Sequence, residues 1–380
     1  MRTAVRALFL HRDLVFHGGV PKSFLYFAQN RDRCRVNLTV AAFAPPDDDM
    51  IDAFDEAGSS TITIGDQRFV APVRELRKTI LTRSFDVVVC GSFWSYVTAR
   101  VAARGTKCAV VFWIPGIGLA MRGRVRRLLF RRLARRDTLV YVSEAVRRAH
   151  EFRGHSGRSQ VIYHGVDDPM ISECVKPYPR SCRADFGMAM TDEVVGFVAE
   201  YVELKDHRTL LEAVRLLVDT RPHLLLLFVG TGALENAVRS TAHSLGLEDR
   251  VVFLGARSDA RKILGLLDLY VHPARGEGFG LAAVEAMLAG IPVITSDQGA
   301  FPEYVLHDRT GFLARVGDPR AFAEAIDQAL HDRARTREVA QAGRQTCLER
   351  FSPKRFADEF TTLLEETCAE HRCPARCRSH

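Results

Sequence analysis

Residues 267–296 read "LDLYVHPARGEGFGLAAVEAMLAGIPVITS", and they contain a complete strand–loop–helix–strand pattern. An apolar run typical of a buried strand comes first, and a loop rich in glycine follows it. Helical spacing begins near Leu281, and a second buried strand ends the stretch. A strand that leads through a helix into another buried strand predicts a parallel sheet with a crossover helix.

The same alternation extends over the whole chain of 380 residues. Buried-type strands in the first half are expected at residues 3–10 and in "RVNLTVAAF", "FDVVVC", "CAVVFW" and "TLVYVS". Helical spacing separates them at residues 51–57, 70–83, 93–104, 122–135 and 144–152. After a proline-rich break at residues 166–183, five more buried-type strands follow: "EVVGFVAEY", "HLLLLFVGTG", "RVVFLGA", "LDLYVHP" and "PVITS".

We therefore expect an α/β protein with two Rossmann-like, doubly wound parallel-sheet domains that face a central cleft. The expected N-terminal domain spans residues 1–170, the linker spans residues 171–185, and the C-terminal domain spans residues 186–350. A C-terminal helix at 351–367, free to return to the N-terminal domain, precedes a tail at 368–380.

Composition favours a reducing, cytoplasmic setting. The nine cysteines are scattered and odd in number, which does not fit a disulfide framework. The start, "MRTAVRALFLHRD", is too short and too interrupted for a signal peptide, and no apolar run is long enough to cross a bilayer. The net charge of +7 favours anionic partners without choosing among them.

Two glutamates stand out in the opening stretch. The amides of Gly278, Phe279, Gly280 and Leu281 come at the start of the expected helix, where unsatisfied N–H groups and the helix dipole favour phosphate. Glu277 could then accept hydrogen bonds from hydroxyls beside that phosphate, and Glu285 could reach a second pair of hydroxyls. Hydroxyls on both sides of a diphosphate describe a nucleotide sugar. The alternative is that the glycines serve packing and Glu285 pairs with an arginine from elsewhere.

The motif "HPARGEGFGLAAVEAMLAGIPVITSDQGAFPEYVLHDRTGFL", residues 272–313, resembles the signature of family 4 glycosyltransferases, including its E-x7-E spacing. Further similarity lies in "HGGVPKSFLYFAQ", "YVSEAVRRAHEFRGHSGRSQVIYHGVDD" and "FVGTGALENAVRSTAHSLGLEDRVVFLGARSD". The resemblance covers most of the chain. It implies the GT-B fold and sugar transfer from a nucleotide donor with retention at the anomeric carbon, without a metal or other cofactor.

The resemblance also implies roles for particular residues. Glu277 and Lys205 would be catalytic: Glu277 would bind the donor sugar, and Lys205, in "VAEYVELKDHRTLLEAV", would neutralise the departing diphosphate. Glu285 would bind the ribose hydroxyls, and the amides of residues 278–281 would hold the diphosphate.

Two glycines near the N-terminus match the pattern of this family, and two other residues depart from it. Gly18 and Gly19 would let the backbone approach the donor phosphates or the acceptor, although a plain turn explains them equally well. The family usually carries an arginine where this sequence has Glu200, and a histidine where it has Pro115. Either a neighbouring residue takes over, for example Arg122 or Arg124 in place of the missing arginine, or catalysis is slowed or lost.

Two groups of potential metal ligands are present, and we expect neither to bind metal. Asp47 and Asp49 have D-x-D spacing, but they precede a helix, where aspartate is a favoured cap. The tail has ligand-type residues in a spacing that fits no zinc finger. They are Cys368, His371, Cys373, Cys377 and His380.

Residues 121–137, "MRGRVRRLLFRRLARRD", form the most basic segment. One interpretation is a helix that packs on its sheet through Val125, Leu128, Leu129 and Leu133 and exposes a solvated basic face. The other is a surface helix that lies on anionic lipid at the inner face of the membrane. No nucleic-acid motif accompanies the segment, so we expect no nucleic-acid partner.

The sequence thus predicts a retaining, metal-independent glycosyltransferase of hexosyl type. The donor would be a UDP- or GDP-linked sugar, and the acceptor a glycan, a lipid-linked glycan or a small molecule. Two alternatives remain open. One is a non-catalytic GT-B protein that binds a nucleotide sugar or a partner. The other is a basic binder of membranes or nucleic acid.

Overall fold

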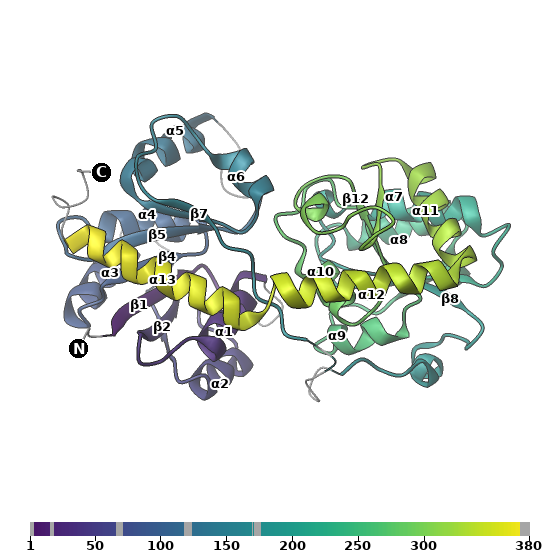
Figure 1. The fold of residues 1–380 in the computed structure, drawn as a ribbon, viewed down its shortest axis with the longest axis horizontal. Coiled ribbons are helices and arrows are strands. Elements are labelled where there is room, and N and C mark those ends of the chain that lie inside the picture. Colours follow the sequence, from purple (N-terminus) through teal and green to yellow (C-terminus); the bar gives the residue numbers. More distant parts are fainter. Residues whose placement is uncertain are drawn as a thin grey trace. The chain divides into compact units, whose positions relative to one another are not determined.

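Each half of the chain builds its own parallel sheet with helices on both faces (Figure 1). The computed structural model describes residues 4–15, 19–65, 71–117, 124–168, 170 and 176–372. The chain divides into two units. The first unit comprises residues 1–165 together with 351–380, and the second unit comprises residues 166–350.

The first unit contains a seven-stranded sheet in the order β3-β2-β1-β4-β5-β6-β7, and every strand pair in it is parallel. Its strands are β1 (Val5–His11), β2 (Val36–Ala42), β3 (Ser60–Thr63), β4 (Val87–Cys90), β5 (Ala109–Ile114), β6 (Thr138–Tyr141) and β7 (Ser159–Val161). Its helices are α1 (Gly19–Asn30), α2 (Asp48–Glu56), α3 (Ala71–Thr82), α4 (Phe93–Ala102), α5 (Arg124–Leu133), η1 (Ala134–Arg136), α6 (Glu144–His150) and α13 (Pro353–Arg372).

The last helix, α13, belongs to the first unit although it follows the second unit in sequence (Figure 1). Its Phe360 ring lies 5.7 Å from the ring of Phe9 on β1 and 5.2 Å from that of Trp113 on β5. Arg35 also donates two hydrogen bonds to Glu365, at 2.9 and 2.8 Å. The chain end therefore completes the aromatic core of the first unit.

The second unit contains a six-stranded parallel sheet in the order β10-β9-β8-β11-β12-β13. Its strands are β8 (Glu193–Val198), β9 (Leu224–Val229), β10 (Val251–Phe253), β11 (Leu269–His272), β12 (Val293–Ser296) and β13 (Phe312–Ala314). Its α-helices are α7 (His207–Leu217), α8 (Glu235–Ser244), α9 (Ala260–Ile263), α10 (Leu281–Leu288), α11 (Pro319–His331) and α12 (Arg333–Arg350). Its 3-10 helices are η3 (Arg180–Phe186), η4 (Glu203–Lys205), η5 (Glu248–Arg250), η6 (Leu264–Leu266) and η7 (Phe301–Glu303).

The predicted doubly wound α/β class is confirmed, with two differences in detail. The sequence pattern does not reveal three short strands at sheet edges, β3, β7 and β13. In addition, residues 180–185 do not belong to a linker. They lie in η3, where the buried Arg183 donates to the carbonyl of Leu266 at 2.7 and 3.0 Å, within the second unit.

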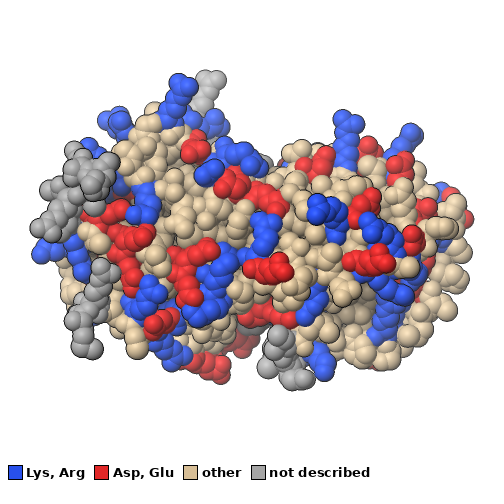
Figure 2. Space-filling view, viewed as in Figure 1, with Lys and Arg blue, Asp and Glu red and all other residues tan. Residues whose placement is uncertain are grey.

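The basic helix α5 does not pack on its sheet through the expected apolar stripe. Val125 and Leu128 are 79% and 67% exposed, whereas Phe130 is buried and lies 5.9 Å from the ring of Phe112. Lys and Arg side chains gather over this helix in the space-filling view (Figure 2). The exposed face of α5 therefore combines apolar and basic side chains. Among the described residues, no helix is long and apolar enough to cross a membrane.

Candidate functional site

Lys205 and Glu277 meet at the point where the strand order of the second sheet reverses. Lys205 ends η4, which follows β8, and Glu277 lies in the loop after β11. β8 and β11 are neighbours in the sheet, although their crossovers run in opposite directions. In open parallel sheets, ligands bind at the carboxyl ends of the strands at such a point. The Lys205 ammonium donates a hydrogen bond to the Glu277 carboxylate there.

Three groups hold the Glu277 carboxylate. Besides Lys205, the backbone N–H of Gly278 donates to Oε1 at 3.1 Å, and His272 Nε2 lies 3.3 Å from Oε2. Burial would by itself raise the pKa of Glu277, but the charge of Lys205 and the close contact with His272 outweigh burial and hold the pKa well below its usual value. Glu277 is therefore a carboxylate at neutral pH, and it is fixed in direction.

His272 is buried between aromatic rings and acts as a neutral partner of Glu277. The rings of Phe197 and Phe301 each lie 4.9 Å from the imidazole, and the Tyr270 hydroxyl lies 3.0 Å from Nδ1. Burial and the nearby charge of Lys205 lower the pKa of His272 to about 4. If the Tyr270 hydroxyl donates to Nδ1, the neutral ring carries its proton on Nε2, which faces Glu277.

Glycines let the loop after Glu277 turn sharply into α10. Gly280 has φ +85°, and a Cβ there would lie 2.7 Å from the Phe301 ring and 2.9 Å from the Tyr304 hydroxyl. That hydroxyl donates to the carbonyl of Phe279 at 2.5 Å. Helix α10 begins at Leu281. The N–H groups from residue 278 to 281 thus precede or open the helix, where helix geometry supplies no carbonyl for them and the dipole favours an anion.

Glu285 lies on α10 and is 6% exposed. Its Oε1 lies 3.5 Å from Nε of Arg261, and Arg261 donates to the carbonyl of Asp167 at 2.9 Å. The sequence-based alternative that an arginine pairs with Glu285 thus describes the contact seen here. This contact gives the buried carboxylate a cationic partner and does not exclude a ligand role.

A second cation lies beside Lys205. Arg275 Nε donates to Asp206 at 2.8 Å, and the Arg275 backbone N–H donates to the carbonyl of Leu204 at 2.8 Å. Asp206 has φ +51°, and its carboxylate accepts a hydrogen bond from the Thr209 hydroxyl at 2.8 Å, so the arginine is held on a fixed turn. Glu200, which stands in the place of the family arginine, is exposed after the end of β8.

The predicted site residues of the first unit are less completely described. Gly18 lies outside the described residues, and Gly19 is the first residue of α1. Pro115 follows β5, and His150 Nε2 lies 2.9 Å from the carbonyl of the adjacent Gly116. The arginines that the sequence offers as substitutes, Arg122 and the side chain of Arg124, are outside the described part.

The potential metal ligands are not assembled in the described part of the chain. Asp47 stands at the N-cap position of α2, with an extended backbone and no side-chain cap hydrogen bond. Of the tail residues, Cys368 and His371 lie on α13, and the other three are outside the described residues. No described group of three or more His, Cys, Asp or Glu side chains could hold a metal ion.

Reasoning from the sequence missed His272, Arg275 and Arg261. The first two lie within "VHPARGEG", directly before Glu277. A histidine and an arginine directly after a buried parallel strand are typical of a ligand site, so the sequence does contain a signal for these two residues. Arg261 carried no such signal, because only the folded chain brings α9 beside Glu285.

A reversed strand order, a glycine turn into a helix and a fixed lysine–carboxylate pair are the features of a ligand site at the carboxyl ends of the strands in a doubly wound α/β domain. The family described as "Glycosyl transferases group 1" matches residues 181–346, and "Glycosyltransferase Family 4" matches residues 17–168. A Bacillus subtilis protein that carries the name glycosyltransferase EpsD is 31% identical over 78% of this chain and 81% of its own length. The chain belongs to the family 4 glycosyltransferases.

One solved structure and one further relative are also similar to this chain. The solved structure of Anabaena Alr3699/HepE in complex with UDP-glucose matches with a TM-score of 0.82 and 23% identity, over 95% of this chain and 99% of that chain. The N-acetyl-alpha-D-glucosaminyl L-malate synthase of Bacillus anthracis is 26% identical over 60% of this chain and 59% of its own length. The chain has the GT-B fold and is a glycosyltransferase.

Proposed function

We propose that this protein is a retaining, metal-independent glycosyltransferase that takes a hexose-type sugar from a UDP- or GDP-linked donor. The acceptor would be a glycan, a glycolipid or a small molecule. The observation that carries the proposal is the contact of Lys205 with Glu277 in front of the first turn of α10. A cation, a carboxylate and the N-terminus of a helix thus lie together at the edge of the sheet where ligands bind.

The diphosphate of the donor is assigned to the start of α10. The amides of residues 278–281 would donate to its oxygens, and the helix dipole adds positive potential. Lys205, which contacts Glu277, and Arg275, which pairs with the adjacent Asp206, would neutralise the charge that builds up on the leaving group. Arg275 thereby offers a cation in place of the family arginine that Glu200 replaces.

The two glutamates are assigned to different parts of the donor. Glu277 is ionised and only 15% exposed at its side chain, so it suits a hydroxyl of the transferred sugar next to the anomeric carbon. Glu285 lies farther along the helix and would accept hydrogen bonds from the ribose hydroxyls, with Arg261 orienting its carboxylate. The diphosphate oxygen would take the proton of the attacking acceptor hydroxyl.

The names of related proteins support a nucleotide-sugar donor and a surface-glycan setting. Solved structures of Anabaena HepE contain UDP, UDP with glucose, or UDP-glucose. Two Rhizobium meliloti relatives, LpsE and LpsB, are named as a glycosyltransferase and a mannosyltransferase of lipopolysaccharide core biosynthesis. A role in building a polysaccharide or glycolipid on the cytoplasmic side of the membrane fits these names.

Helix α5 is assigned to reversible contact with anionic lipid. Val125 and Leu128 are exposed, and basic side chains flank them on the same helix (Figure 2). The guanidinium of Arg126 lies 5.6 Å from the ring centre of Trp94, a half-exposed aromatic residue on α4. Arginine, aliphatic and tryptophan side chains on one surface suit the boundary between lipid headgroups and acyl chains.

A non-catalytic relative is the second candidate, because Glu200 and Pro115 depart from the family pattern. Such a protein would need Glu285 and the helix-start amides to hold a nucleotide. It would have little use for the Lys205–Glu277 pair. Donor turnover therefore separates the two candidates.

Thermal shift with UDP- and GDP-linked sugars tests the donor assignment. A ligand that binds only the native state raises the melting temperature. We expect one nucleotide sugar to raise it for the unmodified protein, and Glu285→Ala or Arg275→Gln to reduce that rise. Arg215→Gln, which removes an exposed arginine at the far end of α7, is the matched control and should keep it. The donor assignment fails if no nucleotide sugar gives a shift.

A further inference from the structure

A pocket of about 290 Å³ lies at the edge of the second sheet opposite the candidate donor site. Asp268, which precedes β11, and Pro292, which precedes β12, both line it, so the pocket lies at the amino ends of these strands. Its floor is apolar and comprises Leu267, Leu269, Ile291, Pro292, Ala329 and Leu330. The volume is close to the lower limit of small-molecule sites, about 300 Å³.

Arginines form the walls of this pocket. Arg333, Arg337 and Arg344 follow one another at helical spacing on α12, and all three line the pocket. Arg180 lines it from η3 on another side. Guanidinium groups therefore surround an apolar floor.

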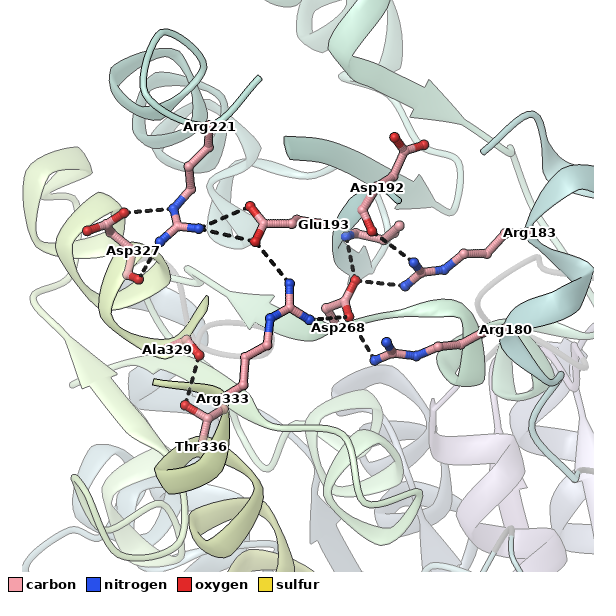
Figure 3. A network of polar contacts seen from close by, with 11 residues as sticks. Arg180, Arg183, Asp192, Glu193, Arg221, Asp268, Asp327, Ala329, Arg333 and Thr336 are labelled. Carbon is pink, nitrogen blue, oxygen red and sulfur yellow. Dashed lines mark hydrogen bonds and ion pairs between the residues drawn. The ribbon is translucent and has the colours of Figure 1, made fainter. Parts of the chain in front are cut away.

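A buried carboxylate fixes two of these walls in place (Figure 3). Asp268 is 4% exposed at its side chain and lies 2.7 Å from Arg180, 2.7 Å from Arg183 and 3.4 Å from Arg333. Arg333 also pairs with Glu193 at 2.9 Å. Arg180 and Arg333 are thus held before any ligand arrives, which lowers the entropic cost of binding.

Positive charge exceeds negative charge around the pocket. The lining and the network that holds it contain six arginines: Arg180, Arg183, Arg221, Arg333, Arg337 and Arg344. Their carboxylate partners are four: Asp268, Glu193, Asp327 and Asp168. Arg337 makes no ion pair or hydrogen bond with the residues that the structure describes, so its guanidinium is free for a ligand.

We propose that this pocket is a second binding site, which takes a small organic anion. Arg180 and Arg337 would bind its phosphate or carboxylate, because a guanidinium presents paired donors to either group. The organic body would lie on the apolar floor. Arg344 donates to the carbonyl of Leu288, the last residue of α10, so the pocket lies at the end of this helix remote from the candidate donor site.

Calorimetric titration with phenyl phosphate tests the proposal, with benzoate and inorganic phosphate as further probes. Four proteins are compared: the unmodified chain, the double variant Arg180→Gln/Arg337→Gln, Arg335→Gln and Lys205→Ala. Arg335 lies on α12 outside the pocket lining and controls for loss of one charge from that helix. Lys205→Ala perturbs the candidate donor site, which would also attract phosphate. Melting temperatures establish that each variant is folded.

We expect saturable 1:1 binding of phenyl phosphate that the double variant weakens about a hundredfold, because each of the two guanidinium groups strengthens binding about tenfold. Arg335→Gln and Lys205→Ala should change it by less than about twofold. Inorganic phosphate lacks an apolar body, so it should bind at least about tenfold more weakly than phenyl phosphate. Benzoate shows whether a carboxylate can take the place of the phosphate group. The proposal is overturned if saturable binding is absent, if the double variant binds equally well, or if only Lys205→Ala abolishes binding.

Discussion

The contacts of Glu277 suit a carboxylate that stabilises positive charge as this charge develops at the anomeric carbon of the donor. It is fixed by Lys205, by the N–H of Gly278 and by the neutral ring of His272. A carboxylate fixed in this way needs no rearrangement when positive charge grows at the anomeric carbon, and such preorganised groups contribute most in the transition state. Glu285, by contrast, would contact a part of the donor that does not change during the reaction.

Replacement of the two glutamates should therefore affect different kinetic constants. We expect Glu277→Gln to lower kcat by about a hundredfold or more with little change in KM, because its contact strengthens in the transition state. Glu285→Ala should mainly raise KM, because ribose contacts are equal in both states. Steady-state kinetics with varied donor measures both constants. Equal and small effects from the two changes would contradict the assignment.

The lowered pKa values of His207 and His272 should make the free energy of unfolding of the second unit depend on pH. Burial lowers the pKa of His207 to about 3 and that of His272 to about 4, whereas an unfolded histidine has a pKa near 6.5. Between these values the unfolded chain binds protons that the folded chain does not bind. The free energy of unfolding should therefore fall as the pH falls from about 6.5 toward 4.

Urea unfolding at several pH values between about 5 and 7 checks this dependence, above the range in which most carboxylates titrate. His272→Asn removes one of the two groups and should reduce the slope by at most about 1.4 kcal/mol per pH unit. A stability that is constant, or that rises on acidification in this window, would show that the histidines are not held neutral.

Single residues differ in how far the sequence reveals them. Glu277, Lys205 and Glu285 stand in motifs, so their place could be predicted. The two cation partners, Arg261 for Glu285 and Arg275 for Asp206, could not be assigned because each pair joins separate elements of the fold. The buried state of His272 likewise follows from the rings of Phe197 and Phe301, which lie far from it in sequence.

At the scale of elements, α5 departs from the ordinary amphipathic helix. A helix usually buries its apolar stripe, but α5 buries Phe130 and exposes Val125 and Leu128. Helical spacing predicts where a stripe lies, yet it does not say whether the stripe faces the core or another surface. The packed interpretation of residues 121–137 therefore named the wrong contact residues: α5 packs through Phe130 and not through Val125 and Leu128.

If α5 contacts lipid, Leu128→Ser should weaken sedimentation with anionic vesicles without loss of stability, because this side chain is already exposed. Arg127→Glu with Arg131→Glu should abolish it, since each basic residue near such a surface contributes about 1 kcal/mol. Leu216→Ser on α7 of the second unit removes an apolar side chain of similar exposure and is the control. Vesicle binding that weakens neither at higher salt nor in the α5 variants would contradict contact of α5 with lipid.

Helix α13 shows how a distant segment completes a core. Phe360 is fully buried between Phe9, Phe27 and Trp113. We expect Phe360→Ala to lower the free energy of unfolding of the first unit by about 3–5 kcal/mol, because it leaves a cavity among aromatic rings. Leu81→Ala on α3, where the side chain is 54% exposed, should cost less than about 0.5 kcal/mol. Denaturant unfolding measures both, and a small effect of Phe360→Ala would refute the packing described.

Elements differ in predictability for a physical reason. The central strands are apolar runs buried on both faces, and the sequence shows them clearly. β3 reads "STIT" and β7 reads "SQV", and both are short, polar and partly exposed at or near the sheet edge. These two strands form because a neighbouring strand offers hydrogen bonds to them. Their own sequences contain no local pattern that indicates a strand.

At the scale of the whole molecule, the chain consists of two units with separate cores, and the first unit needs both ends of the chain. The fold class followed from the alternation of strands and helices, and membership of family 4 followed from its motifs. The sequence does not determine whether a protein with Glu200 and Pro115 still turns over its donor. That question depends on the complete set of charges around the leaving group, and in the proposed function Arg275, which pairs with Asp206 beside Lys205, would belong to this set.

The central claim is that the site cleaves a nucleotide sugar without a metal, and nucleotide release tests it most directly. The unmodified protein and Glu277→Gln are incubated for hours with UDP- or GDP-linked hexoses in EDTA, with and without a cell-envelope extract as acceptor. We predict that the unmodified protein releases UDP or GDP faster than Glu277→Gln, with or without EDTA. Binding of a nucleotide sugar without release above the Glu277→Gln control would contradict the claim. So would release that EDTA abolishes and manganese restores.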